Sequence, residues 1–501
     1  MKPKFLLLGG TLLALGLGVA SMNVGHPRVW VSHYENVLGT SLDLQVGAVS
    51  EAVARRAEEA ALGEIDREAR ILSAWDASSE FSRWTQTHGE AVLVSPELFE
   101  VLGLFDQWRE RTEGALDASA EAVTRVWKQA EKRSALPSRG ELNSAVEAVR
   151  QRHWQLDAAH RTATHLSYTP LALNSFAKSY IAGHAADAVL KERGVRSVVV
   201  NIGGDLVVRG AVRERVDVAD PKSDAENAAP IVSIDVRDRT IATSGNYRRG
   251  EEIGGRHYSH IVDPRTGLPC YEILSSTVIA SNPADAGAMA TAFSVLAPQE
   301  SRRVAASVPG AEYLLITRSG QRIMSPGFAA LIAAAQPVPS PSPAPSPDAW
   351  DGMQLTITFD LAKQGMRARR PYLAAWVEDT NKFPVRTLAL WYNRDRWLPE
   401  LRAWYRSDHV RAAAEGKDLA HSIASATRSS GHYTLQWDGK DNQGKLVKAG
   451  KYVVYIECAR EHGGYDLFHH EIDFNGTPAK VEIPEGHEIA SASIDYHKIA
   501  R

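Results

Sequence analysis

The sequence contains very little cysteine. Only two cysteines, Cys270 and Cys458, occur among 501 residues, and neither belongs to a Cys-x-x-Cys motif or to a cluster with histidine. A metal site built from thiolates and a framework of several disulfides are therefore excluded. A single long-range disulfide between these two cysteines stays open from the sequence alone.

The sequence also lacks a large excess of charge of either sign. Its formal net charge is −3 at neutral pH, and no basic run is interleaved with aromatic residues. Nucleic acid, which requires a basic surface, is therefore not expected as a partner. With 44% hydrophobic and 23% charged residues, the composition is that of a globular protein long enough for two or three cores.

Long apolar runs are missing except at the N-terminus. There, Lys2 and Lys4 precede an apolar run ending at Ala20, which is short for a membrane span of about 20 residues. A basic start, a short apolar run and small residues after it are typical of an export signal. We therefore predict that residues 1–21 are a signal peptide or export anchor and that the protein acts in the periplasm.

Helical and strand patterns alternate up to residue 335. The apolar spacing predicts helices over residues 51–72, 96–111, 118–132, 181–191 and 284–296, and strands over residues 37–46, 197–202 and 276–280. A strand, a helix, another strand and a Gly-Gly turn in succession favour a mixed sheet with helices packed on it. The fold class expected for residues 30–335 is therefore mixed α/β.

A Pro/Ser segment, residues 336–349, separates this region from the C-terminal one. Its alternating composition predicts an extended linker rather than a packed element. Residues 350–501 are rich in Trp, Tyr and strand patterns, with residues 433–437 and 452–456 on either side of a turn-rich segment. This pattern predicts an all-β, Ig-like sandwich in which those two strands form a long hairpin.

The most informative stretch is residues 243–269. Gly254 and Gly255 permit a tight reversal, so the two ends of the stretch can lie side by side as a hairpin. His260 and Asp263 are its candidate catalytic residues, because an imidazole held beside a carboxylate on a rigid turn suits general-base chemistry. The alternative is a surface hairpin in which the histidine merely ends a strand.

The motif His-x-x-Asp-Pro-x-Thr-Gly at residues 260–267 follows a Ser-Gly-x-Tyr strand at residues 244–247. Together they resemble the signature of the ApbE-type flavin transferases, which split FAD with magnesium and attach FMN to a Thr or Ser hydroxyl of a target protein. The resemblance spans residues 37–331. It implies a two-lobed domain with FAD in the cleft, and a role for His260 in deprotonating the acceptor hydroxyl.

The resemblance also implies the flavin-binding residues. Leu38 and Trp75 stand where the family has a flavin-contacting Met and a ring-stacking Tyr, and an indole can also stack. Lys178 matches the lysine of an Ala-Lys-Gly-Tyr motif in which Ser179 replaces the glycine. The full set expected to bind FAD is Leu38, Trp75, Ala115, Leu116, Asp117, Lys178, Gly203, Gly204, Ser244, Gly245 and Ile261.

A magnesium site is expected near the helix at residues 284–296. Asp285 and Thr291 are hard oxygen donors there, and Mg²⁺ often needs only one or two protein ligands besides phosphate oxygens. The alternative is that Asp285 only complements the helix dipole. The resemblance implies a metal-binding Asp at the position of Gly287, so the ligands are Ser175 and Thr291 with water, or with Asp285 after a local shift.

Three functions are compatible with these residues. The first is an exported FAD:protein FMN transferase, favoured by His260, Asp263 and Lys178. The second is a flavin-binding or partner-docking protein without turnover, favoured by Gly287 and by Ala172, where the resemblance implies an FAD-contacting Asp. The third is a magnesium-dependent FAD pyrophosphatase, in which water replaces the acceptor hydroxyl.

The C-terminal region has a resemblance of its own. Its WDGKDNQG segment at residues 437–444 is similar to Ig-like modules of secreted bacterial proteins, and residues 350–501 resemble the DUF2271 domain. Exposed aromatic residues there suit docking of an acceptor flavoprotein with a Thr or Ser flavinylation motif, or of a membrane redox partner.

Overall fold

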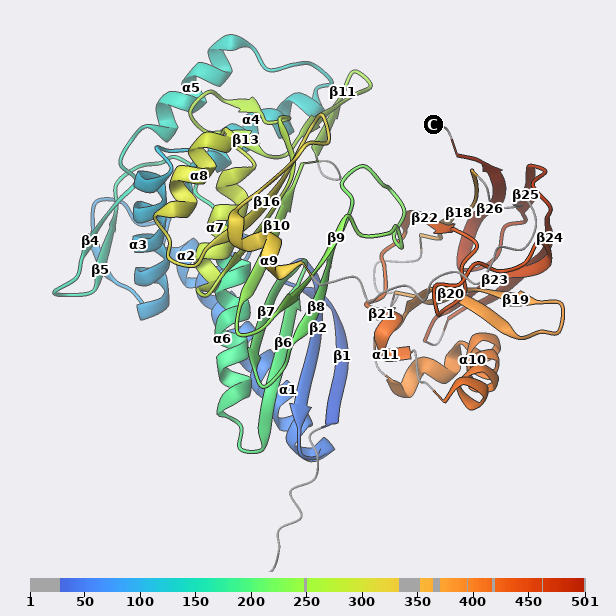
Figure 1. The fold of residues 1–501 in the computed structure, drawn as a ribbon. Coiled ribbons are helices and arrows are strands. Elements are labelled where there is room, and N and C mark those ends of the chain that lie inside the picture. The colour runs from blue at the N-terminus through green and yellow to red at the C-terminus, as the bar shows by residue number, and fades with distance from the viewer. Residues whose placement is uncertain are drawn as a thin grey trace, which may run out of the picture.

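The structure, a computed structural model, describes residues 28–246, 250–332, 352–363, 370–393, 395–416, 420–461 and 463–499. The chain forms an N-terminal and a C-terminal part (Figure 1), and each part has its own hydrophobic core. The expected export segment and the Pro/Ser linker lie outside the described residues. No helix within these ranges has the length and apolarity that a membrane span requires.

One large sheet organises the N-terminal part. Its strands run in the order β1-β2-β6-β7-β10-β15-β16-β17, and every neighbouring pair is antiparallel. The prediction of a mixed sheet is therefore wrong. Ala48 pairs with Val195, so the long connection between β2 and β6 joins adjacent strand ends, as a hairpin does, instead of crossing over. The strands are β1 (Arg28–Val37), β2 (Thr40–Ala48), β6 (Val195–Ile202), β7 (Asp205–Gly210), β10 (Thr240–Gly245), β15 (Ile273–Ala280), β16 (Glu312–Thr317) and β17 (Arg322–Met324).

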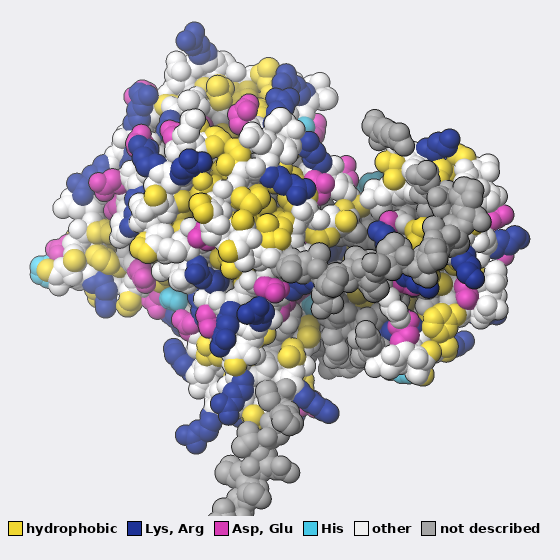
Figure 2. Space-filling model, viewed as in Figure 1, with side chains coloured by type: hydrophobic (Ala, Val, Ile, Leu, Met, Phe, Trp, Pro, Cys, Tyr) yellow, Lys and Arg dark blue, Asp and Glu magenta, His cyan; other side chains and the backbone are white. Residues whose placement is uncertain are grey.

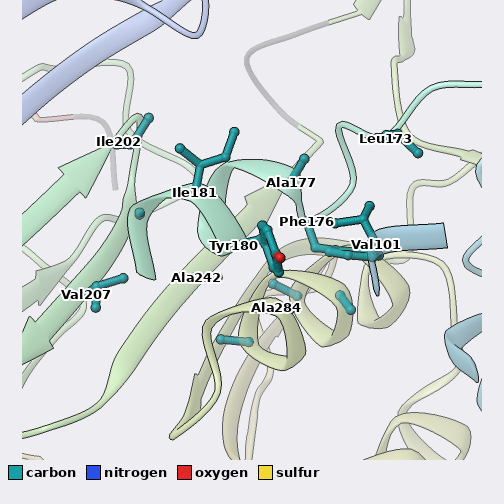
Figure 3. Packing of buried hydrophobic residues seen from close by; sticks show 14 of the residues in the cluster. Val101, Leu173, Phe176, Ala177, Tyr180, Ile181, Ile202, Val207, Ala242 and Ala284 are labelled. Atoms are coloured by element: carbon teal, nitrogen blue, oxygen red, sulfur yellow. The ribbon is translucent and has the colours of Figure 1, made fainter. Parts of the chain in front are cut away.

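Three helices cover one face of this sheet, namely α1 (Glu51–Leu72), α6 (Ala177–Lys191) and α7 (Pro283–Phe293). The bounds of α1 confirm the helix predicted over these residues. Its start is fixed because the Ser50 side chain accepts a hydrogen bond from the Val53 N–H. Figure 3 shows Tyr180 and Ile181 of α6 in a core that also contains Val207 of the sheet.

The opposite face of the sheet is covered as well. The hairpin of β8 (Glu214–Val218) and β9 (Val232–Val236), together with α9 (Pro326–Leu331), packs on apolar side chains of the central strands. Val199 and Val200 therefore point into different cores, one on each face. Burial on both faces explains the unbroken apolar run of β6, the strand that contains both residues.

A second lobe lies beyond the end of the sheet (Figure 1). Its core joins α4 (Ala120–Lys132), α5 (Arg139–Val149) and the hairpin of β11 (Gly250–Ile253) and β12 (Arg256–Ser259). The hairpin turns at Gly254 and Gly255, both at positive φ, which confirms the predicted reversal. Other elements of the N-terminal part are α2 (Glu80–Trp84), β3 (Ala91–Leu93), α3 (Pro96–Arg111), β4 (Trp154–Asp157), β5 (Thr162–His165), β13 (Val262–Asp263), β14 (Leu268–Pro269) and α8 (Pro298–Ala306).

The C-terminal part contains two sheets that share one core. The strands at residues 431–437 and 450–459 belong to different sheets, so the predicted long hairpin is wrong and the turn-rich segment crosses between sheets. One sheet has the order β22 (Gly431–Trp437), β18 (Met353–Leu361), β26 (Ile489–Lys498), β25 (Ala479–Ile483). The other has the order β21 (Ala424–Ser425), β20 (Pro384–Trp391), β19 (Tyr372–Asp379), β23 (Gly450–Ala459), β24 (Tyr465–Phe474).

Helices also belong to the C-terminal part, which corrects the all-β prediction. They are η1 (Asp395–Glu400), α10 (Arg402–Glu415) and α11 (Ala420–Ile423), and they pack on the outer face of the five-stranded sheet. The start of α10 is stabilised by the buried Glu457 of β23, whose carboxylate accepts hydrogen bonds from the N–H groups of Ala403 and Trp404 at 2.9 and 2.8 Å.

The two parts contact each other directly. The segment after β8 reaches edge strand β22, where the Glu226 N–H donates to the Thr434 carbonyl at 2.8 Å. The Asn227 side chain exchanges two hydrogen bonds with the Gln436 backbone, both 2.8 Å long. Hydrogen bonds to the backbone fix the register of this contact, because they require the two segments to align.

Both cysteines are free thiols, Cys270 in the N-terminal part and Cys458 buried in the C-terminal part. The disulfide that the sequence left open is therefore not formed. On the face shown in Figure 2, basic and acidic side chains are interspersed rather than gathered in separate areas.

Candidate active site

A cavity of about 470 Å³ lies between the helical layer of the sheet and the second lobe. Most of the residues predicted to bind flavin or metal line its wall, together with the predicted catalytic residue His260. These are Trp75, Ala115, Leu116, Asp117, Ser175, Lys178, Gly203, Ser244, Gly245, His260, Ile261 and Thr291. Segments far apart in the sequence thus meet in one place, as a ligand site requires.

His260 enters the cavity from the segment that follows β12. The backbone on either side is held by hydrogen bonds: the Ile261 N–H donates to Ser259 Oγ at 3.0 Å, and the Cys270 N–H donates to the Ile261 carbonyl at 2.8 Å. These contacts fix the position from which the imidazole projects. The expected pairing of both ends of the stretch does not occur, because Gly245 pairs with Ser275 of β15.

Asp263 does not line the cavity. Its carboxylate accepts hydrogen bonds from Arg265, with Nε at 2.9 Å and Nη2 at 3.0 Å, and its carbonyl accepts one from the Gly267 N–H at 2.8 Å. The Asp-Pro-x-Thr-Gly turn is thus closed by Asp263 itself. Both its carboxylate and its carbonyl are therefore engaged within the turn that follows His260.

Trp75 forms an exposed aromatic surface at the mouth of the cavity. Its side chain is 77% exposed, although large aromatic side chains are usually buried. The ammonium group of Lys128 lies 5.6 Å from the centre of the ring, within the range of a cation–π contact. An exposed indole with a cation on one face offers its other face to a planar ligand.

Asp117 shapes the wall opposite the sheet. Its carboxylate lies 2.8 Å from Arg109 Nε and accepts hydrogen bonds from the N–H and hydroxyl of Ser119 at 2.8 and 2.6 Å. These partners hold the Ala115-Leu116-Asp117 turn, and Asp117 is only 4% exposed. The negative charge of Asp117 is therefore largely neutralised by groups of the protein itself.

Helices α6 and α7 approach each other closely along the cavity floor. Gly183 stands against Pro283, since a Cβ at Gly183 would lie 2.6 Å from the proline ring. One turn further, a Cβ at Gly287 would lie 2.4 Å from Ser179 Oγ. One turn beyond that, the Thr291 hydroxyl donates a hydrogen bond to the carbonyl of Ser175, which precedes α6, at 2.8 Å.

Asp285, predicted as a metal ligand, lies outside the cavity wall. Burial raises the pKa of its carboxyl group, and the nearby guanidinium of Arg111 partly offsets this. Its N–H donates to the Asn282 side chain in the first turn of α7. The structure therefore does not place Asp285 beside Ser175 and Thr291.

Two further predicted residues lie at turns of the sheet and do not line the cavity. Leu38 is at the turn between β1 and β2, with φ of +51°, a conformation that is strained for a bulky side chain. Gly204 follows Gly203 in the turn between β6 and β7, and its N–H donates to Asn201 Oδ1 at 3.0 Å. This turn brings Asp205 into the cavity wall.

Asp205, which follows Gly203 and Gly204, was not predicted as a ligand-binding residue. Its Oδ2 accepts a hydrogen bond from Ser179 Oγ at 2.8 Å. Burial raises the pKa of Asp205 to about 6, while the Ser179 hydrogen bond and the charge of Lys178 oppose this. It is thus a carboxylate held in place by a neighbouring helix.

The prediction also missed one face of α4. Glu121, Thr124 and Lys128 line the cavity. Their spacing of three and four residues places them on one side of a helix, so a polar stripe was visible in the sequence. A polar stripe is usually a solvated surface, which is why this signal was not sufficient.

The charges around the cavity nearly cancel. The carboxylates lining it belong to Asp117, Glu121, Asp205 and Glu251, and the ammonium groups to Lys128 and Lys178. Asp117 is paired with Arg109, and Glu121 with Arg125 at 3.0 Å. Two carboxylates then face two lysines, so the phosphates of a bound dinucleotide would still need positive charge.

The fold is that of a two-lobed α/β protein with a ligand-sized cavity between its lobes. Comparison with known proteins identifies the family. Residues 38–315 match the ApbE family, and the protein belongs to that family. Residues 354–491 match DUF2271, described as a predicted periplasmic protein.

Individual relatives agree with this assignment. The chain is 25% identical over 340 residues to the FAD:protein FMN transferase of Klebsiella pneumoniae, covering 65% of this chain and 96% of that protein. It is 29% identical over 329 residues to the FAD:protein FMN transferase of Treponema pallidum, covering 61% and 90%. The crystal structure of the ApbE protein from Thermotoga maritima matches with a TM-score of 0.55 and 26% identity, covering 61% of this chain and all of that one.

Proposed function

We propose that the protein is an exported FAD:protein FMN transferase that moves FMN from FAD to a Thr or Ser hydroxyl of an acceptor protein. The observation that carries this proposal is the convergence of Trp75, Lys178 and His260 on one cavity. The names of the relatives, all transferases of this kind, support it.

Each of the three side chains has a distinct part in the proposed reaction. Trp75 stacks on the flavin ring, for which its exposed face is available. Lys178, in the first turn of α6, interacts with the diphosphate. His260 accepts the proton of the acceptor hydroxyl, which enters from the open side of the cavity.

The transfer itself is a displacement at phosphorus. The acceptor oxygen forms a bond to the phosphorus of the FMN half while its proton passes to an imidazole nitrogen of His260. The bond from that phosphorus to the bridging oxygen breaks, and AMP leaves with the bridging oxygen. Positioning and charge neutralisation provide most of the rate acceleration in such reactions.

Magnesium is proposed as the cation of the site. The Ser175 carbonyl and the Thr291 hydroxyl lie 2.8 Å apart at the cavity wall and are hard oxygen donors, which fits this ion. When bound, Mg²⁺ supplies the positive charge that the lining residues lack. Asp285 is not part of this group in the structure.

The acceptor is proposed to be a periplasmic flavoprotein with a Thr or Ser flavinylation motif. The description of DUF2271 as periplasmic supports this location. We propose that the two sheets of the C-terminal part form an Ig-like sandwich. This part is suited to docking the acceptor or a membrane redox partner. Its fixed contact with the N-terminal part supports a docking role.

The proposal is tested by covalent labelling. The protein lacking residues 1–20 is incubated with FAD, Mg²⁺ and a substrate protein that carries a flavinylation motif, and the products are analysed by mass spectrometry. We expect an FMN adduct on one Thr or Ser, release of AMP, and loss of both on addition of EDTA. FMN and AMP formed without acceptor would instead identify a pyrophosphatase.

A second function is favoured by one observation, namely that Gly287 offers no side chain to a metal. A flavin-binding protein without turnover would bind FAD in the same cavity but form no adduct. Stoichiometric FAD binding with no labelling in the same experiment would establish this alternative and contradict the transferase proposal.

A further inference from the structure

Position 287 has no room for a metal-binding side chain in this protein. Ser179 Oγ lies 2.4 Å from where a Cβ at Gly287 would be, and Cβ of Phe176 lies 3.1 Å from it. Ser179 is fully buried, so its hydroxyl has no solvent to turn to. The hydroxyl of α6 thus fills the space that a side chain of α7 would use.

The same hydroxyl is hydrogen-bonded to a carboxylate. Ser179 Oγ donates to Asp205 Oδ2 at 2.8 Å, and Asp205 lines the cavity together with Ser175 and Thr291. Ser179 Oγ therefore lies beside Gly287 and is bonded to Asp205. One oxygen of Asp205 is held by this hydrogen bond, which restricts the rotation of the carboxylate.

Two of the other three lining carboxylates are bound to arginines, and the third, Glu251, lies on β11 in the second lobe near Glu131 and Lys128. Asp117 is bound to Arg109 and Glu121 to Arg125. Asp285 lies outside the cavity wall near Arg111. Asp205 has Lys178 as its neighbouring charge, and Lys178 also lines the cavity, where it can interact with ligand phosphates.

We propose that Asp205, positioned by Ser179, is the carboxylate ligand of the divalent cation, together with the carbonyl of Ser175 and the hydroxyl of Thr291. This inference rests on the proposed function for the cation and for the phosphates that complete its coordination. The Thr291 hydroxyl donates its proton to Ser175, so its lone pairs stay available to a cation. One carboxylate, two neutral oxygens, water and phosphate form a set that suits Mg²⁺.

The test measures cation binding directly. Mn²⁺ is titrated into the protein with bound FAD, and free Mn²⁺ is followed by electron paramagnetic resonance. We expect Asp205→Asn to weaken Mn²⁺ binding at least about tenfold and Ser179→Ala to weaken it less, since only positioning is lost. Asp285→Asn, which removes the rival carboxylate, should leave the affinity unchanged.

Two outcomes would overturn the inference: wild-type affinity in Asp205→Asn, or a comparable loss in Asp285→Asn. A restoration experiment guards against a folding defect. In the Asp205→Asn background, Ser179→Gly with Gly287→Asp should recover Mn²⁺ binding, because the glycine frees space for a carboxylate on α7. Gly287→Asp without Ser179→Gly should not.

The inference and the proposed function can fail separately. Mn²⁺ binding that depends on Asp205 in a protein without covalent labelling would support the metal site and contradict the transferase. Labelling that survives in Asp205→Asn with unchanged Mn²⁺ affinity would do the reverse.

Discussion

The hydroxyl of Ser179 lies 2.4 Å from the position that a Cβ at Gly287 would occupy. This relationship sets the distance between α6 and α7 at the cavity floor. Gly287→Ala should therefore destabilise the protein, by about 1–3 kcal/mol, because the methyl group forces the helices apart. Urea unfolding measures the change.

A matched control exists on another helix. Gly63 lies on α1 and has no atom within 4 Å of the position of an added Cβ. Gly63→Ala should therefore stabilise the protein, by up to about 1 kcal/mol, through helix propensity alone. Ser179→Gly combined with Gly287→Ala should recover much of the loss; equal destabilisation with and without Ser179→Gly would contradict the clash.

Removal of the His260 imidazole should abolish most catalysis while leaving the ligand in place. His260→Ala is expected to lower the rate of covalent flavin transfer by about 10²- to 10⁴-fold, the usual contribution of a general base. Affinity for FAD should change little. The control is His257→Ala, since His257 lies on the same hairpin but bonds to Glu252 outside the cavity. Equal loss of labelling and FAD binding in His260→Ala would refute the general-base role.

Trp75 should contribute to flavin affinity without contributing to stability. Trp75→Ala is expected to weaken FAD binding by up to about tenfold, because stacking on an aromatic side chain is worth about 0.5–1.5 kcal/mol, whereas Trp75→Tyr should restore most of it. Flavin fluorescence quenching measures the affinity. Tyr168 is a suitable control, because it is 84% exposed and does not line the cavity. Tyr168→Ala should bind FAD like the wild type.

Local features of the fold were predictable from the sequence. The helix at residues 96–111 was predicted with the bounds of α3, because Ser95 caps it and Pro96 begins it. Strand pairing was not predictable, since periodicity shows which faces are apolar but not which strands are neighbours. Helix α10 was missed because its start depends on Glu457, a residue distant in the sequence.

The residues of the candidate site show the same difference between local features, which were predictable, and features that depend on distant residues, which were not. Trp75, Lys178 and His260 were found through motifs, and the structure brings them together. Asp263 stands three residues from His260, but its carboxylate bonds to Arg265. Sequence spacing gave the distance along the chain but not the direction of the side chain. Asp205 could be recognised as a site residue only from the packing of α6, which brings Ser179 into hydrogen-bonding distance of it.

Stability should depend on pH through His184. Its Nδ1 lies 2.6 Å from Glu68 Oε1, and this hydrogen bond raises the pKa of His184 above 6.5 despite partial burial. A raised histidine pKa stabilises the folded state fully below about pH 6.5, and the stabilisation disappears as the pH passes the raised value. The wild type should exceed His184→Gln in unfolding free energy by about 1 kcal/mol at low pH, with the difference shrinking as pH rises.

The charges around His184 decide the sign of this effect. Glu64, Glu68 and Glu100 all favour the imidazolium, and Arg67 is bound to Glu64 and Glu68. Urea unfolding at several pH values between about 5.5 and 9 would reveal the trend. His160→Gln is the control, because His160 is an exposed side chain that pairs with Asp157. A pH-independent difference for His184→Gln would contradict the assignment.

The contact between the two parts should depend on Asn227. This side chain exchanges two hydrogen bonds with Gln436 on the edge strand β22. Asn227→Ala removes both and leaves backbone groups of an edge strand without these partners, at a cost of about 1–2 kcal/mol. Hydrogen exchange in β22 should then become about tenfold faster. Asn381→Ala, at the exposed turn between β19 and β20, should leave it unchanged. Unaltered exchange in Asn227→Ala would mean that this contact does not hold the C-terminal part in place.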